Sequence, residues 1–169
     1  YECREPAVLK WFEKLGPRLR ALIDDHGESG DDASPESESA RRLITAGAAV
    51  KRTHFKRQQH NKVLVVKRNG VPVRALAGST NFSLRGLYIQ ANNVLLFEDK
   101  NIATLYADVF AAYWSNPKKF HEHPLSQQWH VGRGTPESRF SFCFSPHRDE
   151  ALSLDPVAQA IREAESSVL

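Results

Sequence analysis

Two groups of polar residues lie at opposite ends of one apolar stretch, HNKVLVVKRNGVPVRALAGSTN, at 60–81. In chain order the two groups are His60 with Lys62, and Ser79, Thr80 and Asn81 directly after Gly78. A neutral imidazole can attack phosphorus and hold a covalent intermediate, and its ordinary pKa of about 6.5 keeps it neutral near pH 7. Lys62 would supply positive charge to phosphate oxygens, and Asn81 with the loop amides would donate hydrogen bonds to them. These residue types indicate phosphoryl transfer, and we expect no metal or other cofactor.

A β-hairpin would bring the two groups together. Two apolar runs flank Asn69-Gly70, and this dipeptide favours a type I′ turn because both of its residues accept a positive φ. Counting back from the turn predicts that Lys62 faces Ala77 and that His60 faces Ser79. Pro72 lies beside the turn and predicts imperfect pairing there, because proline has no N–H to donate.

The distribution of charge along the chain is strongly uneven. Residues 24–40 contain seven acidic residues and no Lys or Arg, whereas residues 41–97 contain eleven Lys or Arg and no Asp or Glu. A stretch of one sign creates a positive local field that attracts polyanions. A solvated basic face is the alternative reading of the same composition.

The remaining pattern predicts an α/β fold with a mixed β-sheet flanked by helices. Apolar residues at 6–23 have helical spacing that Gly16-Pro17 interrupts, and the acidic segment near 24–40 reads as a mobile loop, with a short helix over 36–47. Strands are expected at 92–99 and 139–146, and helices at 101–115 and from Asp155 with Pro156 in the first turn. We expect one domain over 1–150, followed at 151–169 by a C-terminal helix or the start of a second repeat.

The motif HNK…GSTNFS resembles the HKD motif of the phospholipase D superfamily, and the resemblance covers roughly residues 60–115. It implies a phospholipase D/nuclease-like fold. It also implies that His60 is the nucleophile or its partner acid. Lys62 and Asn81 would bind the phosphate, Ser79 would support them, and the loop residues Gly78, Ser79 and Thr80 would bind the substrate. His54 and Lys56 repeat the His-x-Lys spacing, but RQQ follows them instead of a strand.

Two positions depart from this family pattern. The usual Asp five residues after the Lys is replaced by Lys67, and the stretch to the glycine is longer. Lys67 would lie roughly 23 Å from His60 along a straight strand, too far to touch the reacting phosphate. Where many members have a Glu that orients the His, this chain has Asn92, with Gln90 nearby. An amide can orient an imidazole but does not stabilise an imidazolium as a carboxylate does.

The residues and the resemblance together favour a metal-independent phosphodiesterase, with nucleic acid preferred over phospholipid as substrate because the motif lies in the basic stretch. A non-catalytic nucleic-acid-binding module on the same fold is the alternative. The chemistry needs a second histidine as general acid, so we expect a second HKD half in a longer chain or a homodimer mate. With only two cysteines, Cys3 and Cys143, a cytoplasmic location is the default expectation. His121 and His123 are expected in an exposed loop and not at a metal site.

Overall fold

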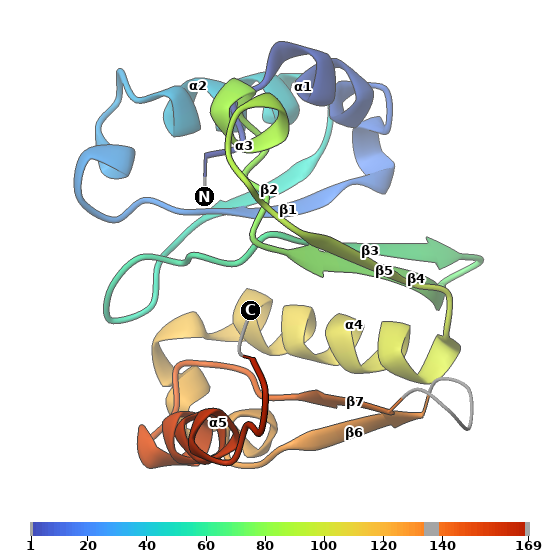
Figure 1. Ribbon diagram of the computed structural model, residues 1–169. Helices are drawn as coiled ribbons and strands as arrows, with labels where there is room; N and C mark the ends of the chain where they lie inside the picture. The colour runs from blue at the N-terminus through green and yellow to red at the C-terminus, as the bar shows by residue number, and fades with distance from the viewer. Residues whose placement is uncertain (1, 134–138, 168–169) are drawn as a thin grey trace. The chain divides into compact units, whose positions relative to one another are not determined.

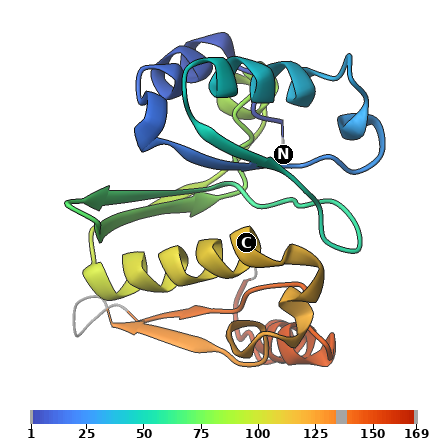
Figure 2. The same ribbon diagram turned by 180° about the vertical axis from the view of Figure 1, so that it is seen from behind.

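The computed structural model describes residues 2–133 and 139–167, and the chain forms two compact units, Tyr1–Lys118 and Lys119–Leu169 (Figures 1 and 2). The first unit contains α1 (Pro6–Glu13), η1 (Gly16–Arg18), β1 (Arg20–Ile23), η2 (Gly27–Gly30), α2 (Pro35–Thr45), β2 (Ala49–Arg52), β3 (Val63–Arg68), β4 (Val71–Gly78), α3 (Leu84–Tyr88), β5 (Val94–Phe97) and α4 (Lys100–Ser115). The short helix η3 (Pro117–Glu122) follows, and the second unit continues with η4 (Pro124–Ser126), β6 (His130–Arg133), β7 (Arg139–Phe142) and α5 (Ala151–Arg162). Among the described residues, no helix combines the length and apolarity that a membrane crossing requires.

The first layer of the first unit packs two helices on a parallel strand pair. β1 and β2 run parallel, and α2 connects them (Figure 1). The core of this layer consists of buried apolar side chains from α1, β1, α2 and the residue just before β2, namely Leu9, Ile23, Ala40, Leu43 and Ala48. Because β1 and β2 are parallel, both carboxyl ends lie at one edge, where the chain leads into the loops 24–34 and 53–62.

The strand β1 replaces the second half of the helix predicted over 6–23. Helix α1 ends at Glu13, and the chain then turns at Gly16, whose φ of +51° a glycine adopts readily and which begins the short helix η1. Four residues from Arg20 then pair with β2. The tertiary pairing overrides the local helical spacing of the apolar residues.

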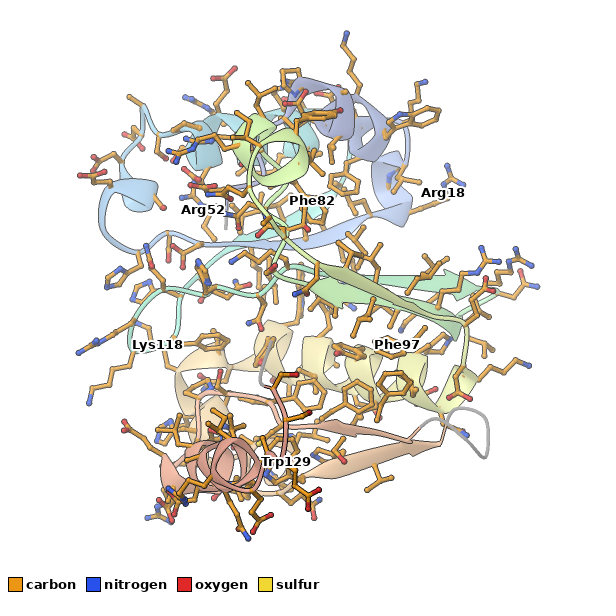
Figure 3. The ribbon with its side chains drawn as sticks, in the orientation of Figure 1. Arg18, Arg52, Phe82, Phe97, Lys118 and Trp129 are labelled. Atoms are coloured by element: carbon orange, nitrogen blue, oxygen red, sulfur yellow. The ribbon has the colours of Figure 1, made fainter. Side chains whose placement is uncertain are left out.

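The acidic segment is more ordered than the mobile loop predicted near 24–40. It contains η2, and α2 begins at Pro35 because the Ser34 side chain accepts a hydrogen bond from the Ser37 N–H at 3.1 Å. Arg52, labelled in Figure 3, donates to the Ser37 hydroxyl at 2.8 Å and to the carbonyl oxygen of Ser29. Local hydrogen bonds of small polar side chains thus fix a segment that has few apolar residues.

The hairpin forms at Asn69-Gly70 as predicted, but its register changes inside the hairpin. Arg68 pairs with Val71 and Lys67 with Pro72, whereas Val66 pairs with Arg74. Val73 is therefore an extra residue on β4, a β-bulge beside the proline that cannot donate to the ladder.

The bulge makes the predicted pairing wrong by one residue at the far end of the hairpin. Val63, and not Lys62, lies opposite Ala77. His60 lies outside the strand, which begins at Val63, so the predicted pairing of His60 with Ser79 is also wrong.

The antiparallel sheet β3-β4-β5 packs against α4 (Figure 1). Asp99 caps α4 by accepting a hydrogen bond from the Ile102 N–H at 2.8 Å, and Ile102 and Ala103 are buried. The rings of Phe97 on β5 and Tyr106 on α4 stack with centroids 6.2 Å apart. The α/β class predicted from the sequence is confirmed, with the strands of this unit divided between a parallel pair and an antiparallel sheet.

The second unit contains the antiparallel pair β6-β7 and helix α5. The helix begins at Ala151, earlier than predicted, and Pro156 lies inside it. A proline has no N–H for the carbonyl oxygen four residues before it. Here that carbonyl, of Leu152, accepts a hydrogen bond from the Trp129 indole at 2.8 Å. A side chain from another segment therefore satisfies the acceptor that the proline leaves.

Candidate active site

His60 and Lys62 lie on the loop 53–62, immediately before β3. The Lys62 side chain is only 5% exposed, and its ammonium donates a hydrogen bond to the backbone carbonyl oxygen of His60 at 2.6 Å. The His60 side chain is exposed. Because both residues precede the strand, the alternation of side chains along a β-strand does not determine their directions. The lysine instead turns back onto the backbone of the histidine.

The same loop is anchored on α4. Phe55 is buried, and its ring meets the ring of Tyr113 edge to face with centroids 4.9 Å apart. At the other end of the loop, the side chain of Asn61 hydrogen-bonds to Tyr113. The His60 backbone is therefore held between two contacts with one helix.

The loop after β4 is tied to the start of β5. Ser79 donates its hydroxyl hydrogen to Asn92 Oδ1 at 3.1 Å, and Thr80 donates to the carbonyl oxygen of Asn93 at 3.3 Å. Gly78 runs so close to Asn93 that a Cβ atom would collide with the Asn93 carbonyl oxygen. Gly78, Ser79 and Thr80 thus shape this loop through contacts with residues 92 and 93.

Asn92 and Gln90 act on this loop and not on a histidine. The Asn92 amide donates to the carbonyl oxygen of Gly86 at 2.8 Å and to Gln90 Oε1 at 3.3 Å. Its own oxygen accepts from Ser79. None of these hydrogen bonds involves His60, to which the sequence interpretation had connected Asn92.

Asn81 and Ser83 both hold the carboxylate of Glu2. Asn81 Nδ2 donates to Glu2 Oε2 at 2.8 Å, and the Ser83 hydroxyl donates to the same oxygen at 3.2 Å. Backbone bonds support this contact, because the N–H groups of Arg4 and Glu5 both donate to the carbonyl oxygen of Phe82 (labelled in Figure 3), at 3.0 and 2.8 Å.

Sequence reasoning missed Glu2 and Ser83. Ser83 also caps α3 by accepting a hydrogen bond from the Gly86 N–H at 3.2 Å. In the sequence, the only feature that could have pointed to Ser83 was its place two residues after Asn81.

Electrostatic coupling connects these sequence-distant groups. Partial desolvation lowers the pKa of His60 below its ordinary value of 6.5, and the Lys62 ammonium lowers it further, while Glu2 and Asp24 act in the opposite direction. Burial lowers the pKa of Lys62 from 10.5 to about 8, and the Glu2 carboxylate opposes this. Glu2 therefore connects the two groups of motif residues, through its charge to His60 and Lys62 and through a hydrogen bond to Asn81.

The other histidine of the loop has a different environment. His54 Nδ1 lies 2.6 Å from Asp25 Oδ1, and the ring of His26 lies 5.4 Å from the His54 ring.

In the second unit, His123 Nδ1 accepts a hydrogen bond from the Leu125 N–H at 3.2 Å. Within 2–133 and 139–167, no group of three or more His, Cys, Asp or Glu side chains could hold a metal ion.

The comparison with protein families agrees with this geometry. The family model described as "Cardiolipin synthase, PLD-like domain" matches residues 7–114, more than half of the 169 residues. The chain belongs to the phospholipase D superfamily. The matched part of this PLD-like domain runs from α1 to the last turns of α4 and contains both groups of motif residues. No curated protein matches the chain.

Proposed function

We propose that this PLD-like domain is a metal-independent phosphodiesterase that uses His60 as its nucleophile. The observation that carries the proposal is that a carboxylate of the chain itself, that of Glu2, already occupies the site. Asn81 and Ser83 converge on one oxygen of the Glu2 carboxylate, and the charge of that carboxylate acts on both His60 and Lys62. A non-bridging phosphate oxygen has the same needs, namely hydrogen-bond donors and a nearby cation.

The proposed reaction has two displacement steps. A nitrogen of neutral His60 attacks phosphorus, the N–P bond forms, and the P–O bond to the leaving group breaks. The leaving oxygen takes a proton from a general acid. Water then attacks the phosphorus of the phosphohistidine and loses a proton to a base, and the N–P bond breaks to restore His60 and release a phosphate monoester. Lys62 and Asn81 stabilise the charge on the phosphate oxygens in both steps.

The general acid in this proposal is a second histidine. It would come from a second HKD half of a longer chain or from His60 of a homodimer mate.

We propose nucleic acid as the substrate class. Lys56 and Arg57 are exposed on the loop that carries His60, and residues 41–97 contain eleven cationic residues and no acidic ones. Phosphate contacts by Lys and Arg supply most of the affinity for nucleic acid. Anionic phospholipid is the alternative substrate, and the assay below separates the two.

The test compares the wild type with His60→Ala and with His54→Ala, the matched control on the same loop. Hydrolysis of bis(4-nitrophenyl) phosphate, of single-stranded DNA and of phosphatidylglycerol vesicles is measured with a chelator present. We expect His60→Ala to lower the rate at least about a thousandfold, because the nucleophile is removed, and His54→Ala to change it little. Activity retained by His60→Ala, or wild-type activity lost on chelation, would contradict the mechanism. Cleavage of the vesicles without cleavage of DNA would contradict the proposed substrate class.

A further inference from the structure

Asp24 is a fully buried carboxylate directly after β1. Its exposed fraction is 0%, and it accepts two backbone hydrogen bonds, from the Gln59 N–H at 2.6 Å and from the His26 N–H at 3.2 Å. A buried carboxylate is costly unless hydrogen bonds compensate for the water that it loses, and short bonds to an ionised acceptor are strong. The hydrogen bond from the Gln59 N–H therefore attaches the loop 53–62 firmly to the end of strand β1.

This attachment lies next to the proposed nucleophile. Gln59 immediately precedes His60, and its side chain is itself buried. On the other side of the histidine, the Lys62 ammonium holds the carbonyl oxygen of His60. Asp24 and Lys62 thus fix the backbone on both sides of a side chain that is exposed.

The charge of Asp24 is not neutralised by an ion pair within the described part of the chain. Arg52 lies close, but it donates to the backbone carbonyl oxygen of Asp24 at 3.0 Å and not to the carboxylate. Among the described side chains, the charges of Asp24 and Glu2 favour the imidazolium form of His60, and the charge of Lys62 disfavours it.

We propose that Asp24 is a positioning residue for His60, which fixes the backbone of the nucleophile through the Gln59 N–H and supplies a buried negative charge to the site. This inference rests on the proposed function. Positive charge develops on the imidazole when it attacks phosphorus, and a fixed carboxylate nearby stabilises that charge without rearrangement. Asp24 would in this way supply the negative charge that Asn92 cannot, while it contacts neither the substrate nor the ring.

The test uses Asp24→Asn, with Asp25→Asn as the matched control. Both variants remove one carboxylate at the end of β1, but Asp25 pairs with His54. For Asp24→Asn we expect kcat on bis(4-nitrophenyl) phosphate to fall at least about tenfold with KM nearly unchanged, because the nucleophile is misplaced and the substrate contacts remain. We also expect the NMR titration midpoint of His60 to move to lower pH, because the removed charge favoured the imidazolium. Asp25→Asn should change neither quantity.

A purely structural role of Asp24 would not move the His60 titration, so an unchanged midpoint in folded Asp24→Asn would overturn the inference. Equal effects of the two variants would also overturn it. If Asp24→Asn does not fold, Asp24→Glu replaces it in the test. This variant keeps the negative charge but displaces the hydrogen bond to the Gln59 N–H, so a wild-type kcat for it would refute the positioning role. The NMR titration needs no turnover, so an inactive wild type would count against the proposed function alone.

Discussion

At the scale of single residues, His60 and Lys62 lie close enough that the charge of one changes the pKa of the other. The ammonium is held against the carbonyl oxygen of the histidine, at 2.6 Å, so its position follows the backbone of the nucleophile. The ammonium and desolvation both favour the neutral imidazole. The arrangement favours a neutral imidazole on the proposed nucleophile, beside the cation that would bind its substrate.

These pKa shifts predict the pH dependence of the reaction. The His60 pKa lies below 6.5, so the fraction of neutral nucleophile rises with pH and levels off by about that pH. The Lys62 pKa is about 8, so the positive charge is present below that pH and is lost above it. On bis(4-nitrophenyl) phosphate, whose leaving group needs no proton, we expect kcat/KM to be highest between these two values and to fall up to about tenfold per pH unit on the alkaline side.

Lys62→Arg isolates the alkaline limb of this profile. Arginine keeps its charge throughout the accessible range, so the decline near pH 8 should disappear while the acid limb stays in place. An alkaline limb that is the same in the wild type and in Lys62→Arg would show that another group titrates there.

At the scale of elements, the segment before α1 crosses the site. The backbone N–H groups of Arg4 and Glu5 attach it to the carbonyl oxygen of Phe82, and its Glu2 carboxylate takes the donors of Asn81 and Ser83. A bound phosphate would have to displace this carboxylate. If the proposed function holds, the segment would therefore compete with an anionic substrate for the same hydrogen bonds.

We accordingly expect Glu2→Gln to lower KM for bis(4-nitrophenyl) phosphate by about tenfold, because hydrogen bonds to an ionised acceptor are worth more than those to an amide. The change in kcat should be small. Glu5→Gln is the matched control, with the same loss of charge on the same segment and an unaltered backbone bond to Phe82. A KM that stays constant or rises in Glu2→Gln would argue against competition at this site.

Local patterns in the sequence were sufficient to predict some elements and insufficient for others. The hairpin followed from Asn69-Gly70, because the turn depends only on the φ preferences of those residues. The register past the bulge was wrong, since one extra residue beside Pro72 shifts every later pair. β1 was missed because its pairing with β2 outweighs the helical spacing of its apolar residues.

The motif residues of the site could be predicted, but their partners could not. His60, Lys62 and Asn81 are recognisable by type and spacing. Glu2 reaches the site through its contact with Asn81, and Asp24 through its contact with the Gln59 N–H. Both are tertiary contacts, which no local spacing in the sequence predicts.

At the scale of the whole molecule, the family match and the candidate site both lie within the unit Tyr1–Lys118. The unit Lys119–Leu169 has its own strand pair and helix and lies outside the matched residues. The proposed acid histidine would have to be supplied by a second HKD motif. In the proposed mechanism, nucleophilic attack by His60 needs only this one PLD-like unit, so it can be tested on the chain as it is.

The most direct test of the central claim is to trap the covalent intermediate. The protein is mixed with bis(4-nitrophenyl) phosphate, quenched in alkali within the first turnover, digested and analysed by mass spectrometry. We expect one 4-nitrophenylphosphoryl group on His60, present in His54→Ala and missing in His60→Ala, because attack by the imidazole forms an N–P bond before water enters. Turnover by the wild type with no adduct on His60, or with the adduct on another residue, would contradict the account.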